Sequence, residues 1–364
     1  MKFTDSRIAD LIVSRIREMG LNLRVMHVCG THQDTIVKNG LDVLFARCNV
    51  EMRQGPGCPV CVTPPKEFEE AKLLAKKGCI LTVFGDVVRV PIEGGSLADL
   101  RGEGCDVRVV YSVEDAVKVA KSTNKNVVFM AIGFETTAPS TASVLINEPP
   151  ENFYVLSCHR YVPPALDALL SMGELKLDGL IDPGHVSTII GLKPYEVLTA
   201  KYRIPQVIAG FEPLDLLMAV FMIARQLSNG EAKVENEYTR LVRYEGNQKA
   251  LSIMNSAFEP CDVAWRGFGV IKNSGMKIKK EFQGHDARLA FEDELKVIRD
   301  KEFKEPVGCR CSEVIRGLIY PQECPLFGKV CTPNRPIGPC MVSIEGSCNI
   351  EYKYGRLSLR FNRS

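Results

Sequence analysis

The chain opens with a pattern of apolar residues that is typical of an amphipathic helix. Apolar residues recur at spacings of three and four between positions 5 and 19, and Gly20 follows them as a stop. Thr4 or Asp5 would cap the start of this helix. The sequence therefore predicts a helix with one buried face, which is formed by Ile8, Leu11, Ile12, Ile16 and Met19.

Beyond this helix, short apolar runs end repeatedly in glycine or a polar cluster, as buried strands do. Helical stretches at 113–121, 163–172 and 213–227 lie between several of these runs. Strands that alternate with helices indicate parallel sheets covered by helices, so the predicted fold class is α/β. The predicted strands are 23–28, 80–84, 107–111, 127–132, 154–157, 180–181 and 206–209.

The same pattern divides the chain into three units. Positions 132–135 and 209–212 share Gly-Phe-Glu between an apolar run and a helical pattern, which suggests a remote internal duplication. We therefore expect two similar lobes with mainly parallel sheets and flanking helices, followed by an irregular or α+β unit. The expected boundaries are 20–150, 151–240 and 241–364, with the helix at 1–19 as an element that could pack against the third unit.

Polar motifs stand directly after six of the predicted strands. In open α/β sheets, ligands bind at the carboxyl ends of strands. We therefore expect these motifs to contribute to one shared site or cleft. They begin at Cys29, Gly85, Gly133, Cys158, Asp182 and Gly210.

The composition narrows the classes of partner. The chain has 364 residues, 45% of them hydrophobic, and a formal net charge of +2, so it offers no general electrostatic reason to bind nucleic acid or an anionic membrane. No apolar run is long enough for a membrane helix. The start lacks the features of a secretory signal, which favours a cytoplasmic protein. We expect a chain that is monomeric by itself.

Fourteen cysteines are many for a reducing compartment, and six of them lie within forty residues of the C-terminal unit. Thiolates ligate both zinc and iron–sulfur clusters, but structural zinc usually takes two tight C-x-x-C pairs. The wider gaps here favour a [4Fe–4S] cluster over zinc and over reduced structural or disulfide cysteines. Spacing alone does not choose four ligands from six; the preferred four are Cys309, Cys324, Cys331 and Cys348, which leaves Cys311 and Cys340 as buried neighbours.

A second cysteine motif, Cys58-Pro59-Val60-Cys61, lies in a glycine- and proline-rich context. Two sulfurs at this spacing can cycle between dithiol and disulfide, share a metal, or serve only structure. Redox cycling is the preferred interpretation. A nearby cluster would strengthen it, because a one-electron donor beside a disulfide makes a workable electron path.

Further candidates follow three of the predicted strands. Cys29 stands at the start of a probable helix, where backbone N–H groups favour its thiolate as a nucleophile or metal ligand, with His32 as a second group. His185 could ligate a metal or carry a proton, and Glu135 could accept one. The competing interpretations are a buried inert thiol, a hydrogen-bonded histidine and an ordinary salt bridge.

Several of these motifs together resemble the HypD family of hydrogenase maturation factors. The resemblance spans nearly the whole chain, and its blocks occur in the family's order. They are Cys29-Gly30-Thr31-His32-Gln33-Asp34-Thr35, Gly55-Pro56-Gly57-Cys58-Pro59-Val60-Cys61, Gly133-Phe134-Glu135-Thr136-Thr137-Ala138-Pro139, Pro183-Gly184-His185-Val186-Ser187-Thr188 and the spaced C-terminal cysteines.

The resemblance implies a scaffold on which the Fe(CN)2CO unit of [NiFe]-hydrogenase is assembled, rather than an independent turnover enzyme. It implies that Cys29 binds the iron together with a HypC-type chaperone, and that a HypE-type protein delivers cyanide. The four preferred cysteines would hold a [4Fe–4S] cluster that supplies electrons to Cys58 and Cys61. His32 and His185 would line the same cleft.

Two alternatives remain open at the level of sequence. One is a stand-alone iron–sulfur oxidoreductase that reduces a disulfide of a protein substrate, with Cys29 as an incidental thiol. The other is a structural zinc protein with an interaction role. The chain contains no Walker loop, G-x-G-x-x-G or G-x-S-x-G motif, so the commonest nucleotide-binding and hydrolase functions are not indicated.

Overall fold

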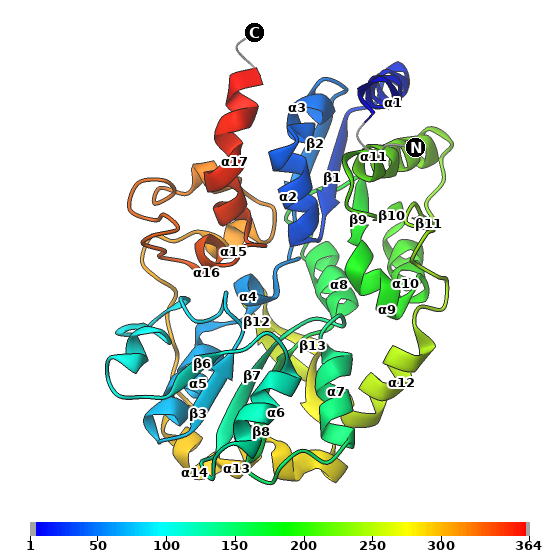
Figure 1. The fold of residues 1–364 in the computed structure, drawn as a ribbon. Helices are drawn as coiled ribbons and strands as arrows, with labels where there is room; N and C mark the ends of the chain where they lie inside the picture. Colours follow the sequence, from blue (N-terminus) through cyan, green and yellow to red (C-terminus); the bar gives the residue numbers. More distant parts are fainter. Residues whose placement is uncertain (1–4, 362–364) are drawn as a thin grey trace.

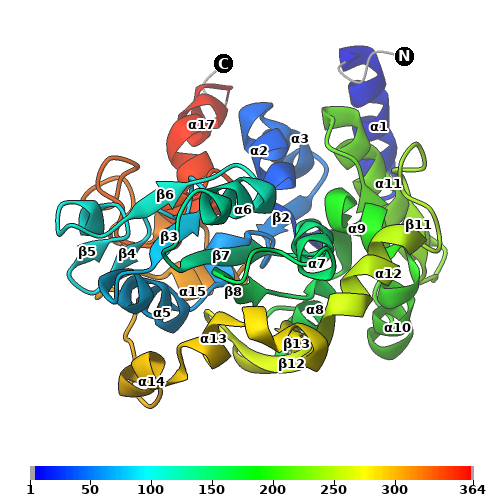
Figure 2. The same ribbon diagram turned by 60° about the horizontal axis from the view of Figure 1, so that its bottom comes forward.

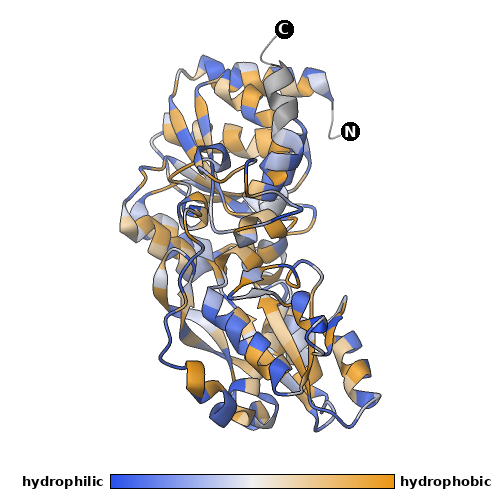
Figure 3. Cartoon of the chain, turned by 90° about the vertical axis from the view of Figure 1, so that its left-hand side faces the viewer, coloured by the Kyte–Doolittle hydropathy of each residue, from blue (hydrophilic) through white to orange (hydrophobic). Residues whose placement is uncertain are grey.

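The computed structural model describes residues 5–361 and contains two mainly parallel sheets with flanking helices (Figure 1). The predicted α/β fold class is confirmed. Figure 3 shows why the hydrophobic pattern of the sequence predicts the elements: the strands are hydrophobic over most of their length, whereas the helices alternate hydrophobic and hydrophilic positions. No described helix is both long enough and apolar enough to cross a bilayer.

The first sheet has five parallel strands in the order β11-β10-β9-β1-β2. Its centre is fully buried on both faces, as expected for a parallel sheet between helices. The strand bounds are β1 Leu23–His27, β2 Val50–Gln54, β9 Gly179–Pro183, β10 Gln206–Ala209 and β11 Val234–Asn236.

Helices cover both faces of the first sheet. Residues of α1, α3 and α11 share one hydrophobic core with Val25, Ile181 and Val207. Residues of α8, α9 and α10 pack on the opposite face with Leu180 and Ile208. The bounds are α1 Ser6–Glu18, α2 Gly30–Lys38, α3 Leu41–Ala46, α8 Val162–Met172, α9 Gly184–Ile190, α10 Lys193–Tyr202 and α11 Pro213–Ser228.

The sequence analysis allowed the N-terminal helix to pack against the C-terminal unit. Among the described residues, this helix packs against the first sheet instead. Helix α1 lies on α11, and Figures 1 and 2 both show α2 and α3 between α1 and the C-terminal helix α17 (Ser347–Phe361). Its apolar face meets the core of the first sheet through Ile12 and Ile16. The Asp5 side chain caps α1, and Thr4 lies outside the described residues.

The second sheet has four parallel strands in the order β6-β3-β7-β8. Helices α6, α7 and α12 cover one face, and α5 packs on the other. An antiparallel hairpin of β12 Phe258–Trp265 and β13 Gly269–Ile278 lies beside β8. The other bounds are β3 Ile80–Val83, β6 Val107–Val109, β7 Val127–Gly133, β8 Phe153–His159, α5 Pro65–Lys76, α6 Val113–Lys121, α7 Ala138–Ile146 and α12 Gln248–Ala257.

The two sheets do not divide at residue 150. Strands β1 and β2 precede that position but pair in the same sheet as β9 to β11, whereas β8 follows it and pairs with β7. The chain therefore leaves the first sheet after β2, builds the second sheet, and returns at β9. Hydrophobic periodicity marks a strand as buried but does not specify its neighbours, which is why the expected boundary differs from the observed strand order.

The cysteine-rich segment after residue 300 consists of loops and short helices beside α2. Helix α17, the last described helix, packs along α2, the first helix after β1 (Figure 2). The remaining elements are α4 Pro59–Val62, β4 Pro91–Ile92, β5 Gly95–Ser96, α13 Ala287–Ala290, α14 Glu292–Leu295, α15 Cys311–Val314, α16 Pro339–Val342 and 3-10 turns at Asp99–Arg101, Lys280–His285, Lys296–Ile298 and Pro321–Glu323.

Candidate functional site

Cys29, His32 and His185 come together at the carboxyl end of the first sheet. Cys29 precedes α2, and His32 lies in the first turn of that helix. The buried His32 ring lies 5.3 Å from the Phe211 ring, and its Nε2 contacts the Ala209 carbonyl at 3.3 Å. The exposed His185 ring stacks on the same phenylalanine at 3.9 Å. Phe211, which follows β10, thus contacts both histidines, which lie in the helices that follow β1 and β9.

The Cys29 thiol is protonated in the free site. Burial and the nearby Glu345 carboxyl raise its pKa to about 11, although the N–H groups of His32 and Thr31 oppose that shift. The sequence analysis expected the helix end to favour the thiolate, but burial outweighs this contribution. A metal that binds Cys29 must therefore displace a proton.

Cys29 shares a small cavity with the Cys58-x-x-Cys61 motif. Cys58 and Cys61 form a disulfide at α4, and both line the cavity together with Cys29 and Cys340. A Cβ atom at Gly57 would lie 2.4 Å from the Cys29 nitrogen, so only glycine lets the two loops approach this closely. The remaining lining residues are His27, Gly30, Gly55, Ile315, Glu345 and Ser347.

A second cavity is lined by all six C-terminal cysteines. The other lining residues are Val314, Leu326, Phe327, Gly338 and Met341, so sulfur is the main donor in an otherwise apolar shell. The Ile337 N–H donates to Cys331 Sγ at 3.3 Å, and a Cβ atom at Gly338 would lie 2.6 Å from Cys309 Sγ. The six sulfurs belong to Cys309, Cys311, Cys324, Cys331, Cys340 and Cys348.

This donor set fits a thiolate-bound iron–sulfur cluster. Soft thiolates select such clusters, and backbone N–H groups directed at sulfur tune their reduction potential. Between residues 5 and 361, no group of three or more His, Cys, Asp or Glu side chains is arranged to hold a single metal ion. The four preferred cysteines all border the cavity, and so do the two that were set aside.

Cys340 is the one described cysteine that borders both cavities. Its Sγ lies 3.0 Å from Cys311 Sγ, and both thiols are fully buried. Sulfur atoms at this separation can be joined by a disulfide after a small movement. Sequence spacing had left Cys311 and Cys340 without a role, whereas the structure places Cys340 between the C-terminal cavity and the Cys58–Cys61 pair, with Cys311 beside it.

Glu345 was also missed by the sequence analysis. It lines the Cys29 cavity, and its Cβ and backbone pack so closely on Gly30 that a Cβ atom there would lie 2.4 Å from the Glu345 Cβ. Burial, with a smaller contribution from Asp86, raises its pKa to about 7. A lone glutamate in an irregular segment carries no periodic signal. Its position near Cys348 was the only available clue.

Glu135 lies outside the cavity that contains Cys29. It borders a separate surface pocket with Tyr161, Pro164 and Met254. One carboxyl oxygen accepts the Val162 N–H at 3.0 Å, and the other has no hydrogen-bond partner among the described residues. Burial raises the pKa of Glu135 to about 8, so the carboxyl is neutral at pH 7.

We expect Glu135→Gln to make the stability of the protein less dependent on pH. The native pKa of about 8 exceeds the ordinary value of 4.5, so the unfolded chain releases a proton that the native chain keeps. Stability should therefore fall as pH rises from about 4.5 to about 8 in the wild type, by roughly 5 kcal/mol at most. Urea unfolding at both ends of this pH range measures the free energy of unfolding of both proteins. An equal change in that free energy with pH in the wild type and in Glu135→Gln would contradict the prediction.

Comparisons with known proteins agree with these observations. The family model HypD, described as the hydrogenase formation hypA family, matches residues 6–355. A Methanocaldococcus jannaschii protein named for hydrogenase expression and formation is 50% identical, over 95% of this chain and 96% of its own. The hydrogenase maturation factors HypD of Cupriavidus necator and Azotobacter vinelandii are 39% and 41% identical, each over 98% of this chain and 96% of its own.

Proposed function

The chain belongs to the HypD family of hydrogenase maturation factors, and we propose that it is the scaffold on which the Fe(CN)2CO unit of [NiFe]-hydrogenase is assembled. The iron is cargo in this proposal. Cys29 binds it from the scaffold side, and the N-terminal cysteine of a HypC-type chaperone binds it from the other. A HypE-type protein brings cyanide to the same cleft.

The surroundings of Cys29 support this role. His32, in the first turn after Cys29, contacts the same Phe211 ring as His185, and the Nδ1 atom of His32 is buried without a hydrogen-bond partner among the described residues. Glu345 lies beside the thiol and is close to half-ionised at neutral pH. It is therefore suited to receive the proton that Cys29 loses when iron binds.

Four of the C-terminal cysteines, Cys309, Cys324, Cys331 and Cys348, would hold a [4Fe–4S] cluster. When bound, such a cluster supplies single electrons. The apolar lining of their cavity, including Leu326 and Phe327, excludes water from the sulfurs. Cys311 and Cys340 border that cavity as a neighbouring pair of thiols.

Cys311 and Cys340 then reduce the Cys58–Cys61 disulfide by thiol–disulfide exchange. The Cys340 thiolate attacks one sulfur of the disulfide, which breaks the S–S bond and forms a mixed disulfide. The Cys311 thiolate attacks Cys340 and releases the second sulfur. Two electrons and two protons pass from one pair to the other, so the products are the Cys311–Cys340 disulfide and the Cys58/Cys61 dithiol. Two protons and two single electrons, which the cluster would supply when bound, would return Cys311–Cys340 to the dithiol.

The observation that carries the redox part is the position of Cys340, which borders both cavities. The alternative is a stand-alone oxidoreductase that uses the same thiols on a protein substrate. Under that alternative, Cys29 is incidental. The shared cavity of Cys29, Cys58 and Cys61 favours the scaffold, because a redox pair beside the iron ligand serves chemistry at the iron.

Infrared spectroscopy of the complex with a HypC-type chaperone tests the proposal. After anaerobic purification from cells that carry the whole maturation system, the complex is expected to show absorption bands of iron-bound cyanide and carbon monoxide. Protein does not absorb in that region. A complex that contains iron but shows none of these bands would contradict the scaffold role.

A further inference from the structure

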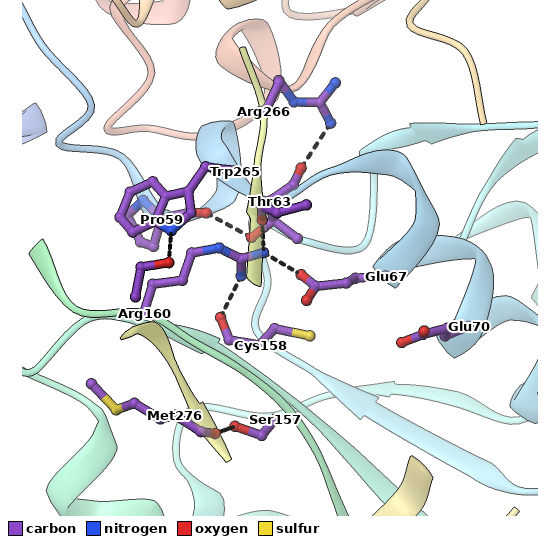
Figure 4. A network of polar contacts seen from close by, with 12 residues as sticks. Pro59, Thr63, Glu67, Glu70, Ser157, Cys158, Arg160, Trp265, Arg266 and Met276 are labelled. Carbon is purple, nitrogen blue, oxygen red and sulfur yellow. Dashed lines mark hydrogen bonds and ion pairs between the residues drawn. The ribbon is translucent and has the colours of Figure 1, made fainter. Parts of the chain in front are cut away.

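One arginine binds three carbonyls at the end of the helix that carries the redox cysteines. Helix α4 is a single turn, and Arg266 donates its backbone N–H to the Val62 carbonyl at 2.7 Å. Its side-chain Nε donates to the Cys61 carbonyl at 2.9 Å, and Nη2 donates to the Thr63 carbonyl at 2.8 Å. Figure 4 shows the guanidinium directed at Thr63.

The position of Arg266 is fixed by its neighbours. It is 4% exposed, lies at the tip of the β12–β13 hairpin, and forms an ion pair with Glu305. The preceding Trp265 stacks on Phe134 at 5.9 Å and donates its indole N–H to Ser274 Oγ at 2.9 Å. Because the tryptophan anchors the hairpin tip, the arginine meets α4 with little freedom.

The same hairpin tip touches the element that carries the second thiol pair. Gly267 has φ +81°, and a Cβ atom there would lie 2.9 Å from the Ser312 carbonyl oxygen. Ser312 follows Cys311 in helix α15. The tip therefore contacts both α4, with Cys58 and Cys61, and α15, with Cys311.

We propose that Arg266 is a positioning residue for exchange between the two thiol pairs, an inference that rests on the proposed redox function. The disulfide itself restrains α4 while it is closed. Once it opens, a single helical turn has little stability of its own. The three hydrogen bonds from Arg266 then keep Cys58 and Cys61 facing Cys340 through the mixed disulfide and the released dithiol.

The test follows exchange inside the cluster-loaded, full-length protein. The protein starts with both the Cys58–Cys61 and the Cys311–Cys340 pairs oxidised, and dithionite, which reduces the cluster, starts the reaction under anaerobic conditions. Acid quenching, thiol alkylation and peptide mass spectrometry then give the fraction of Cys58/Cys61 reduced at each time. The electron paramagnetic resonance signal of the reduced cluster is recorded in the same samples.

Arg266→Gln is expected to slow the exchange about 100-fold, because two charge-assisted hydrogen bonds are lost. Arg266→Lys keeps the charge but not the planar fork, so about tenfold slowing is expected. The matched control is Arg316→Gln. Arg316 bonds to the Ser312 carbonyl and to Glu174, and this control should keep the wild-type rate. The cluster signal should be unchanged throughout.

The outcomes separate this inference from the proposed function. If Arg266→Gln reduces its Cys58–Cys61 disulfide as fast as the wild type does, the role of Arg266 is overturned and the relay stands. A wild-type protein whose cluster is reduced while Cys58–Cys61 stays oxidised would overturn the relay and this inference together. If the glutamine variant does not fold, the lysine variant decides: a rate within twofold of wild type overturns the proposal.

Discussion

Replacing Cys29 with alanine is expected to abolish retention of cyanide-ligated iron in the complex with the small chaperone. Cys29 is the only thiol that the proposal assigns to the iron from the scaffold side, and His32 and His185 cannot replace a thiolate donor to soft, cyanide-bound iron. Iron per complex should fall at least about 100-fold, since the loss of outer-shell partners alone costs 10 to 100-fold at metal sites. Metal analysis and infrared spectra of the purified complex measure it.

The control for this variant is Cys48→Ala. Cys48 is buried like Cys29 but borders neither cysteine cavity, and its thiol donates only to carbonyls within its own helix turn. The C-terminal cluster should remain in both variants, because Cys29 does not line that cavity. Iron retention in Cys29→Ala at the level of Cys48→Ala would sink the scaffold proposal and favour the stand-alone oxidoreductase.

Local sequence pattern was sufficient for most strands and helices. Strand β7 is buried at every position, and the helix at 6–18 has one apolar stripe, so both could be read directly. Strand β2 was missed because it lies at the edge of its sheet and buries only alternate residues of Val-Glu-Met-Arg-Gln. The pairing of β1 with β9 could not be predicted, since no local signal names a partner that is distant in the chain.

The chemistry of the site could be predicted better than its arrangement. Residue type alone pointed to Cys29, to the Cys58 and Cys61 pair, and to the C-terminal cysteines. The meeting of these groups depends on two tertiary contacts: α17 packs on α2, and α16 packs on α4. Neither contact leaves a pattern in the sequence. The proposed roles of Cys340 and Glu345 therefore depend on the tertiary structure and could not be predicted from the sequence.

The folded arrangement also explains why a buried, protonated Cys29 is useful. A thiolate exposed in the free protein would react with oxidants or stray metals. In the proposed function, burial would keep the thiol inert until iron displaces its proton, and the adjacent Cys58–Cys61 pair would bring reducing equivalents to the same cavity. One set of packed loops would thus keep the Cys29 thiol unreactive before iron binds and supply reducing equivalents while iron is bound.

Replacing Cys340 with serine is expected to separate the cluster from the redox pair without removing either. Serine nearly matches the volume of cysteine, and the four preferred cluster ligands remain, so the resonance signal of the reduced cluster should persist. Reduction of Cys58–Cys61 should slow by about 100-fold or more, because a hydroxyl does not replace a thiolate nucleophile in exchange. The dithionite time course with peptide mapping measures both quantities in one sample.

The matched control is Cys79→Ser, which alters a buried free cysteine that borders neither cavity. If Cys340→Ser reduces its Cys58–Cys61 disulfide as fast as this control, electrons reach the pair without Cys340. The cluster would then have to act on the disulfide directly, and the position of Cys340 in both cavities would be a matter of packing. If only Cys340→Ser fails, the path from cluster to disulfide runs through the one sulfur that borders both cavities.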